Sequence, residues 1–425
     1  MLHAVLGVIA VPLALFAQAR GEQLARRSRA ILYLLLGTLA LGFLAANLRA
    51  VAATIAQPPE WDFHWFWIFG RVADLGQNFY DPRFANAIAD SLREPRDLYP
   101  ELFFWYPPPT MFLFAPLGLL KLQPALILWS AFNLGALAAG IVVVYRMFFR
   151  SAGALGALVA ATLVLAWGSV EATLYVAQTN FLLLLAILAY WSQRSKFRGG
   201  LALGVAIMIK PIALLIAIVP VVRRCGNVVA GIVGAGIAGS LAAVAVFGAA
   251  TFATFFIKPP LAHLPAAIFR EPELQSLYAI ITRFGGQVHA PELVQPLFDT
   301  VAVMLTGATL WCVWRLANEE LAIALAIVFA LLLYPGTLTH YAVILLPVIF
   351  LIWLHRDLVG GPVVCATFIT LEYALVSFGS DAVFLATMLC WMLLIAVSVA
   401  EPAVAPYKRA ERFPTTAGTN GSRRA

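Results

Sequence analysis

The sequence predicts an all-α protein that crosses a membrane many times, and three features indicate this class. Its 425 residues are 62% hydrophobic and only 12% charged, with a mean hydropathy of +0.89, whereas soluble domains average roughly 25% charged residues. Apolar runs near the roughly 20 residues that a helix needs to span a bilayer recur as far as Ala400. Short basic clusters separate these runs. We therefore expect residues 1–400 to form one membrane domain of about 11 to 13 transmembrane helices.

The formal net charge of +7 raises the question of a nucleic-acid partner. The basic residues lie in short clusters between apolar runs, which is the pattern of cytoplasmic helix ends rather than of a nucleic-acid-binding face. We therefore expect membrane lipids as partners and no nucleic acid. The clusters are Arg20, Arg26, Arg27 and Arg29; Arg146 and Arg150; Arg194, Lys196 and Arg198; Arg223 and Arg224; Arg315; His355 and Arg356; and Lys408 and Arg409.

The first apolar segment, residues 2–18, has two interpretations. With Ala17-Gln18-Ala19 it is similar to a signal peptide, but no Lys or Arg precedes it and the basic stretch 20–29 follows it. This charge pattern favours a retained helix. With residues 20–29 on the cytoplasmic side, the helix from about Ile31 to Thr54 runs outward.

The next segment, about residues 56–108, is then a first outer loop. It mixes charged and apolar residues, which predicts short amphipathic helices at the membrane surface. Near its start the sequence EWDFHWFW places Asp62 and His64 among aromatic residues. Partial desolvation there would raise the pKa of Asp62 toward that of a general base. The alternative is an interfacial acid that faces water.

The loop ends in Trp105-Tyr106 followed by three prolines. Because proline fixes its own backbone and restricts the residue before it, this run predicts a helix start at the membrane surface. The alternative is that it forms one wall of a cavity. Residues 109–145 then hold two apolar runs separated by Lys121-Leu-Gln-Pro124, and the helix count of this segment stays open.

Residues 199–222 have basic residues at both ends and Lys210-Pro211 in the middle. Two half-crossing helices that meet at Lys210 fit this pattern, because irregular backbone is tolerated at membrane depth where it lines a cavity. An ammonium group in an apolar run costs roughly 2.5–3.5 kcal/mol unless it is paired. We expect an anion such as a lipid phosphate as its partner. The alternative is that Lys210 snorkels to the interface.

The remaining elements follow the same alternation. Glycines within 227–249 predict close helix packing, and residues 251–296 form a second outer loop. Shorter outer turns fall near 171–180, 336–340 and 379–381, and residues 401–425 have the composition of a disordered cytoplasmic tail. The second loop holds a mixed set of residues that either contact sugar or phosphate or form a solvated face: His263, Arg270, Glu271, Glu273, Arg283 and His289.

Three further polar residues share the outer side with Asp62. His340 lies at an outer turn before an apolar run, and Gln178 and Asn180 begin another run from the same side. A lone histidine is commonly structural, and the two amides could simply be helix caps. If they are not, an acid, a histidine and a lysine converge.

Other classes of site are disfavoured. No Walker loop, Rossmann glycine pattern or zincin motif occurs. The four cysteines, Cys225, Cys312, Cys365 and Cys390, lie in or beside apolar runs without C-x-x-C spacing, so we expect neither a disulfide nor a zinc site.

Taken in order, these motifs resemble glycosyltransferase family 87, membrane mannosyltransferases of the GT-C superfamily that use a polyprenyl-phosphate sugar. The resemblance covers most of the chain. The motifs are Asp62-Phe63, Phe69-Gly70-Arg71, Gly76, Tyr80-Asp81, Tyr106-Pro107-Pro108, Ala115-Pro116-Leu117, Gln178-x-Asn180, Gly204 with Lys210-Pro211, Ser276-Leu277, and His340-Tyr341 ahead of Leu346-Pro347.

The resemblance implies a GT-C-type helical bundle with an extracytoplasmic cavity in the cell membrane. Asp62 would act as general base on a hydroxyl of a lipid or glycan acceptor, with inversion at the sugar carbon. Lys210 and His340 would stabilise the departing phosphate without metal or cofactor. The cavity residues would be His64, Tyr106, Gln178, Asn180 and Tyr341. The chain departs from the family pattern in its helix before Arg20 and in Thr339, where the family usually has Asp.

Two alternatives belong to other classes. A transporter or flippase for a lipid-linked substrate should show inverted repeats with paired broken helices, and the sequence has no such symmetry. A non-catalytic membrane scaffold would tolerate replacement of Asp62.

Overall fold

A computed structural model describes residues 2–57, 62–92, 104–259, 266–378 and 380–400. These residues are almost entirely helical, and among them the only β-type pairing is one isolated bridge between Leu274 and Leu338. The predicted all-α class is confirmed. The expected tail 401–425 lies outside the described residues, as do His263 and part of each outer loop.

The longer helices follow one another with short connections. Their bounds are α1 Leu2–Arg20, α2 Arg26–Ala56, α3 Phe63–Asp74, α4 Pro82–Leu92, α5 Met111–Gly118, α6 Leu122–Val144, α7 Gly153–Leu165, α8 Gly168–Tyr175, α9 Asn180–Ser192, α10 Phe197–Ile209, α11 Ile218–Val222, α12 Gly226–Phe247, α13 Ala249–Ile257, α14 Leu277–Gln287, α15 Val294–Arg315, α16 Glu319–Leu333, α17 Leu346–Leu354, α18 Pro362–Phe378 and α19 Ser380–Ala400.

Five segments are long and apolar enough to cross a membrane, judged by length and composition within the described residues. Shorter apolar helices of 10–17 residues pack beside them. At about 1.5 Å per residue, these shorter helices are shorter than the thickness of a bilayer. The chain is therefore a polytopic membrane protein, as predicted. The five segments are Arg26–Ala56, Leu122–Leu165, Gly226–Phe247, Pro291–Arg315 and Asp381–Ala400.

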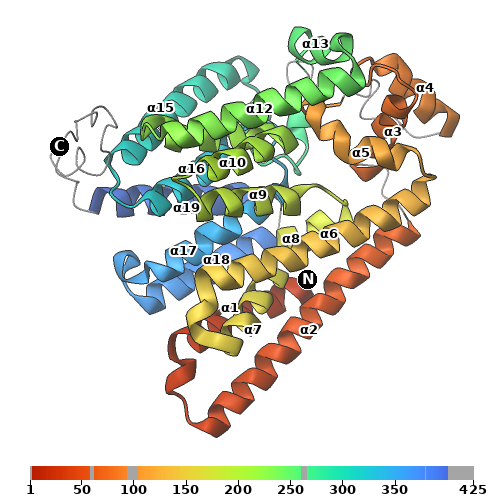
Figure 1. The fold of residues 1–425 in the computed structure, drawn as a ribbon. Coiled ribbons are helices and arrows are strands. Elements are labelled where there is room, and N and C mark those ends of the chain that lie inside the picture. Colours follow the sequence, from red (N-terminus) through yellow and green to blue (C-terminus); the bar gives the residue numbers. More distant parts are fainter. Residues whose placement is uncertain (1, 58–61, 93–103, 260–265, 379, 401–425) are drawn as a thin grey trace, which may run out of the picture.

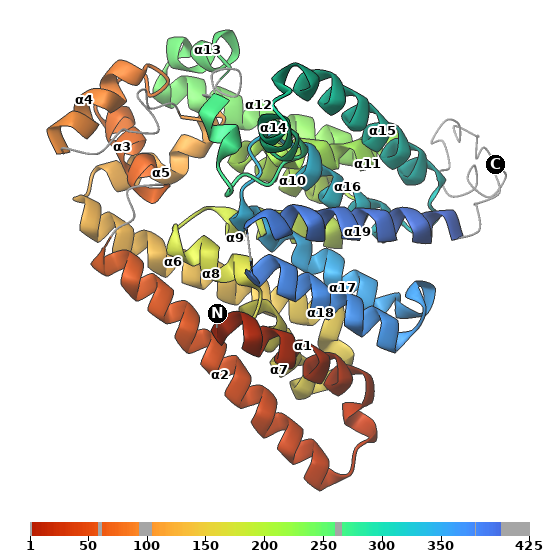
Figure 2. The ribbon, with the colours of Figure 1, turned by 180° about the vertical axis from the view of Figure 1, so that it is seen from behind.

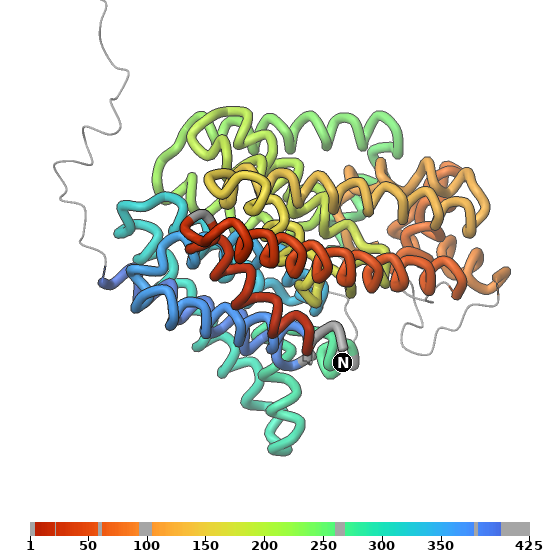
Figure 3. Tube along the Cα trace, turned by 90° about the horizontal axis from the view of Figure 1, so that it is seen from below, coloured from red at the N-terminus to blue at the C-terminus, as the bar shows by residue number. Residues whose placement is uncertain are grey.

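The bundle has two distinct ends. Figures 1 and 2 show α3, α4, α5 and α13 gathered at one end, away from the C-terminal end of α19. The loops with basic clusters meet elsewhere: Arg194 pairs with Glu319 and Glu320, and Arg315 donates to the carbonyl of Val399 at the end of α19. Seen from below, α2 runs along the outside of the bundle for much of its length (Figure 3). The predicted outer loops and the basic clusters thus lie at different ends.

Close glycine contacts join α10 to α12. A Cβ added to Gly200 would lie 2.1 Å from the carbonyl oxygen of Val228, and one added to Gly231 would lie 2.3 Å from that of Phe197. Only glycine lets the two backbones approach this closely. The predicted packing role is confirmed for Gly231, whereas Gly236 of the same run has open space around it.

The structure resolves the two segments that sequence reasoning left open. In 109–145 the short helix α5 packs on α3 at the end that holds the first outer loop, and α6 is one long helix within the segment Leu122–Leu165, which is long and apolar enough to cross a membrane. In 199–222 helix α10 ends at Ile209, Lys210 has an extended backbone, and a 3-10 helix begins at Pro211. The predicted break at Lys210 is therefore present.

Candidate active site

A cavity of about 510 Å³ opens at the end of the bundle that carries α3. Its described wall comes from five parts of the chain that are far apart in sequence: α3, residues 104–106, α8, residues 268–274 and residues 336–340. Aromatic rings make up much of this wall, and aromatic faces suit the apolar faces of sugar rings. The wall residues that carry charge or can titrate are Asp62, Tyr106, Tyr175, Glu271, Glu273 and His340.

Asp62 immediately precedes α3 and lines the cavity. Its φ of 52° is unusual for a residue other than glycine, and strain of this kind tends to occur at functional sites. Its Oδ1 accepts a hydrogen bond of 2.5 Å from Nε2 of Gln178. Burial raises the pKa of Asp62 to about 6, an effect that the Gln178 bond and the charge of Lys210 partly oppose. Asp62 is therefore partly buried at the cavity wall and bonded to a buried amide, rather than fully exposed.

Gln178 lies between Asp62 and the tyrosines that pack behind the cavity wall. It is 1% exposed and precedes α9, and its side chain reaches Asp62 instead of capping the helix. The side chain of Tyr106 lies near those of Gln178 and Tyr341 and interacts with both. The backbone carbonyl of Tyr106 in turn accepts a 2.5 Å bond from the hydroxyl of Tyr80. Among the described residues, Gln178 is thus the side chain that holds the Asp62 carboxylate, and the tyrosines pack around this pair.

Lys210 is completely buried and does not snorkel. Its Nζ donates to Oδ1 of Asn180 over 2.7 Å and lies 3.7 Å from the ring centroid of Tyr341. The amide of Asn180 also donates to the carbonyl of His340 over 3.0 Å. Asn180 is therefore a bridge rather than a helix cap, because it joins the lysine to the turn that carries the histidine.

His340 belongs to the 3-10 helix Thr339–Leu345 and lines the cavity. It is 5% exposed, and its buried Nε2 has no hydrogen-bond partner among the residues that the structure describes. Such a group normally finds a partner, since an unpaired buried nitrogen costs about 1–3 kcal/mol. A ligand in the cavity can supply that partner.

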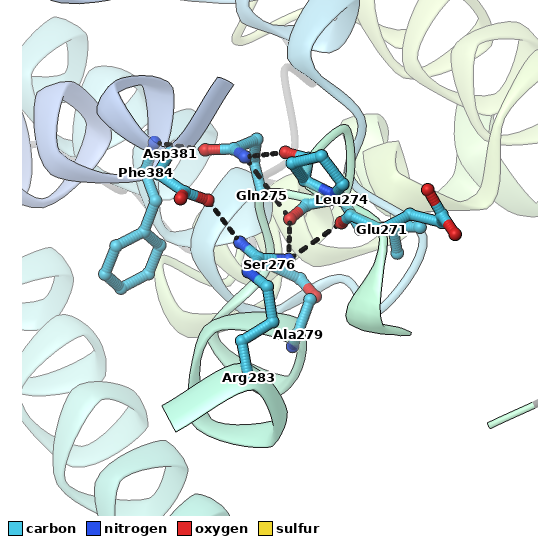
Figure 4. A network of polar contacts seen from close by, with 9 residues as sticks. Glu271, Leu274, Gln275, Ser276, Ala279, Arg283, Asp381 and Phe384 are labelled. Atoms are coloured by element: carbon cyan, nitrogen blue, oxygen red, sulfur yellow. Dashed lines mark hydrogen bonds and ion pairs between the residues drawn. The ribbon is translucent and has the colours of Figure 1, made fainter. Parts of the chain in front are cut away.

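The second outer loop reaches the same cavity. The bridge between Leu274 and Leu338 brings Glu273 beside Thr339, whose hydroxyl donates to Oε2 of Glu273 over 2.8 Å. Figure 4 shows how side chains from α14 and α19 hold this part of the loop. Glu271 and Glu273 thus reach the cavity, while Arg283 lies behind the wall.

The structure brings together seven of the eight residues named from the sequence. Asp62, Tyr106 and His340 line the cavity, and a layer behind them contains Gln178, Asn180, Lys210 and Tyr341. His64 is buried in α3 with its ring edge-on to Trp67, 6.4 Å away, and is not part of the described cavity wall.

The helical period explains why His64 is elsewhere. Four residues at positions i, i+3, i+4 and i+7 line the cavity: Asp62, Trp65, Phe66 and Phe69. This is the spacing of one helix face. A helix that begins after Asp62 places Trp65 on the same face as Asp62 and His64 on another face, so this spacing is the signal in the sequence that separates the two residues.

Comparison with known proteins agrees with this architecture. Residues 104–335 match the model of glycosyltransferase family 87, and this range includes Tyr106, Gln178, Asn180 and Lys210. The match spans more than half of the 425 residues. No curated protein and no solved structure matches the chain. The chain belongs to glycosyltransferase family 87 and is a membrane glycosyltransferase.

Proposed function

We propose that the protein transfers a hexose, mannose by family resemblance, from a polyprenyl-phosphate sugar to a hydroxyl of a lipid or glycan acceptor. The reaction takes place at the extracytoplasmic face of the cell membrane. The observation that carries the proposal is the convergence of Asp62, His340 and the buried Lys210 around one cavity.

In the proposed reaction Asp62 is the general base. Its carboxylate takes the proton from the acceptor hydroxyl as the acceptor oxygen forms a bond to the anomeric carbon of the sugar. The bond from that carbon to the phosphate oxygen breaks, and its electron pair leaves with polyprenyl phosphate. A single displacement of this kind inverts the configuration at the anomeric carbon. Burial beside aromatic rings gives the base its raised pKa of about 6, near the range useful at neutral pH.

Charge on the leaving phosphate is proposed to be stabilised by His340 and Lys210. His340 presents an unpartnered Nε2 at the cavity. The charge of Lys210 acts from behind the wall, through Asn180 and its bond to the His340 carbonyl. Fixed polar groups in a site of low dielectric stabilise developing charge more strongly than water does, so this role needs no metal.

The transporter alternative has less support. Family 87 membership indicates a glycosyltransferase, and the described cavity lies at one end of the bundle rather than at a midpoint between symmetric halves.

The proposal is tested by transfer of labelled mannose from polyprenyl-phosphate mannose to a lipid extract, using purified protein in detergent. We expect transfer by the parent and none by folded Asp62→Asn. Absence of transfer by the parent with several polyprenyl-phosphate sugars would refute the proposed donor.

A further inference from the structure

A second carboxylate in the cavity wall has no part in the reaction described above. Glu273 lines the same cavity as Asp62 and is exposed to it. Only one of its oxygens, Oε2, has a hydrogen-bond partner among the described residues, the hydroxyl of Thr339. The other oxygen is available to a ligand. The buried Nε2 of His340, the residue after Thr339, also lacks a hydrogen-bond partner in the described part of the chain.

The backbone around Glu273 is fixed on two sides. The Glu273 carbonyl accepts from the amide of Thr339 over 3.0 Å, and the Gln275 amide donates to the carbonyl of Thr337 over 2.7 Å. Together with the Leu274–Leu338 bridge, these bonds tie the loop to the turn that carries His340. The carboxylate therefore keeps a set place relative to the histidine.

Polar contacts from two helices hold the loop from behind, as Figure 4 shows. Arg283 of α14 donates to the carbonyls of Glu271 and Leu274 over 2.8 and 2.9 Å and pairs with Asp381 of α19 over 2.8 Å. Gln275, 1% exposed, accepts from the amide of Phe384 over 2.9 Å. A loop anchored in this way presents a pre-organised binding group.

We propose that Glu273 binds hydroxyl groups of the acceptor and thereby makes the site select a neutral, hydroxyl-rich acceptor over one that carries an anionic group beside the reacting hydroxyl. This inference rests on the proposed function and extends it to the acceptor class. A carboxylate with a free oxygen accepts strong hydrogen bonds from sugar hydroxyls. An anionic substituent in the same place would face the carboxylates of Asp62, Glu271 and Glu273.

Glu273 also affects the base through space. Its negative charge raises the pKa of Asp62, whereas Lys210 lowers it. The other titratable groups around the cavity are Glu271, His340 and Tyr175 in its wall and the phenols of Tyr106 and Tyr341. Replacing Glu273 by Gln keeps the size of the side chain and removes its charge. The acidic limb of the transfer rate should then move to lower pH, an effect that loss of packing alone would not produce.

The test compares the parent, Glu273→Gln and the control Glu292→Gln, which changes an exposed acid of the same outer segment that is not among the cavity-wall residues. Binding of a fluorescently labelled hexyl dimannoside is measured by anisotropy. A second probe carries a 6-carboxylate on its terminal sugar. We expect Glu273→Gln to weaken binding of the neutral probe about tenfold, the loss of roughly one charge-assisted hydrogen bond. It should also reduce the preference for the neutral probe and leave binding of polyprenyl phosphate unchanged.

The outcomes separate this inference from the proposed function. Equal neutral-probe affinity in the parent and Glu273→Gln would overturn the role of Glu273, whether or not transfer occurs. If Glu273→Gln binds the neutral probe more weakly but the parent transfers sugar from no polyprenyl-phosphate donor, the role of Glu273 is kept and the proposed donor is rejected. If Glu273→Gln does not fold, Thr339→Val removes the hydroxyl that orients the carboxylate and should weaken binding of the neutral probe by a smaller factor. Unchanged binding in that variant would then count against the proposal.

Discussion

At the scale of single residues, the site contains an acid, Asp62, whose pKa depends on its burial and on the charge of Lys210. Asp62 is partly buried at the cavity wall, and fully buried Lys210 interacts with it electrostatically from behind. The ordinary pKa of the carboxyl, 3.8, rises to about 6. A base must be unprotonated to accept the hydroxyl proton. We therefore expect transfer by the parent to fall as pH drops through about 6, measured as kcat/KM over a pH series, which reports the groups of the free enzyme. A rate that stays constant down to pH about 4 would contradict the role of Asp62 as base.

The same shift has a consequence for stability. A carboxyl that holds its proton more tightly in the folded state stabilises the fold below its unfolded pKa, and that contribution is lost as pH rises through about 6. Because asparagine does not ionise, Asp62→Asn removes this loss of stability at higher pH. We expect the variant to melt at the same temperature as the parent or higher at neutral pH, so inactivity there cannot be attributed to unfolding.

Lys210→Met keeps the aliphatic stem and removes the charge. We expect the KM for the donor to rise about 10- to 100-fold, because a buried charge that favours the phosphate is lost. The acidic limb should move to higher pH, since Lys210 lowers the pKa of Asp62. Lys196→Met, at an exposed position, is the control. Unchanged donor KM in a folded Lys210→Met protein would remove the phosphate role.

At the scale of secondary-structure elements, the position of Asp62 depends on how α3 packs on α5. A Cβ added to Gly70 would lie 2.3 Å from the carbonyl oxygen of Phe114, and one added to Gly118 would lie 2.4 Å from the carbonyl carbon of Gly70. Trp67 and Arg71 of α3 also donate to the carbonyls of Leu120 and Gly118 over 3.1 Å. These contacts explain the Phe69-Gly70-Arg71 motif as packing.

Gly70→Ala should therefore push α3 away from α5 and displace Asp62, which precedes the first turn of α3. We expect a loss of about 1–3 kcal/mol in stability, typical of overpacking, together with reduced transfer. Thermal unfolding in detergent measures the first effect and labelled-sugar transfer the second. Gly135→Ala in α6, where an added Cβ meets nothing within 4 Å, should leave both unchanged. Equal behaviour of the two variants would show that the α3–α5 contact does not position the site.

The element scale also marks the limit of sequence reasoning. The break at Lys210 could be predicted because a charge followed by proline divides an apolar run into two short parts. The cavity face of α3 was not predicted, because the short amphipathic helices expected in the first outer loop carried no assignment of which face meets the site. The pairing of Glu273 with Thr339 depends on a loop contact between residues 66 positions apart, which no local pattern carries.

At the scale of the whole molecule, composition was sufficient to predict the class. Apolar runs and basic clusters define a helical membrane protein whose charged loops meet at one end and whose polar site lies at the other. The convergence of Asp62, Lys210 and His340 could be anticipated from the sequence, because a charge buried in an apolar run is costly unless it has a partner. Which acids share the cavity became clear only from the fold. Membership of glycosyltransferase family 87 is consistent with both the composition of the sequence and the fold.

The most direct test of the account is transfer of labelled mannose from polyprenyl-phosphate mannose by purified parent protein and by Asp62→Asn, with the folded state of both checked by thermal unfolding. The account predicts transfer by the parent, none above background by the variant, and a melting temperature in the variant no lower than that of the parent. Transfer by folded Asp62→Asn at the rate of the parent would contradict the assignment of Asp62 as the catalytic base.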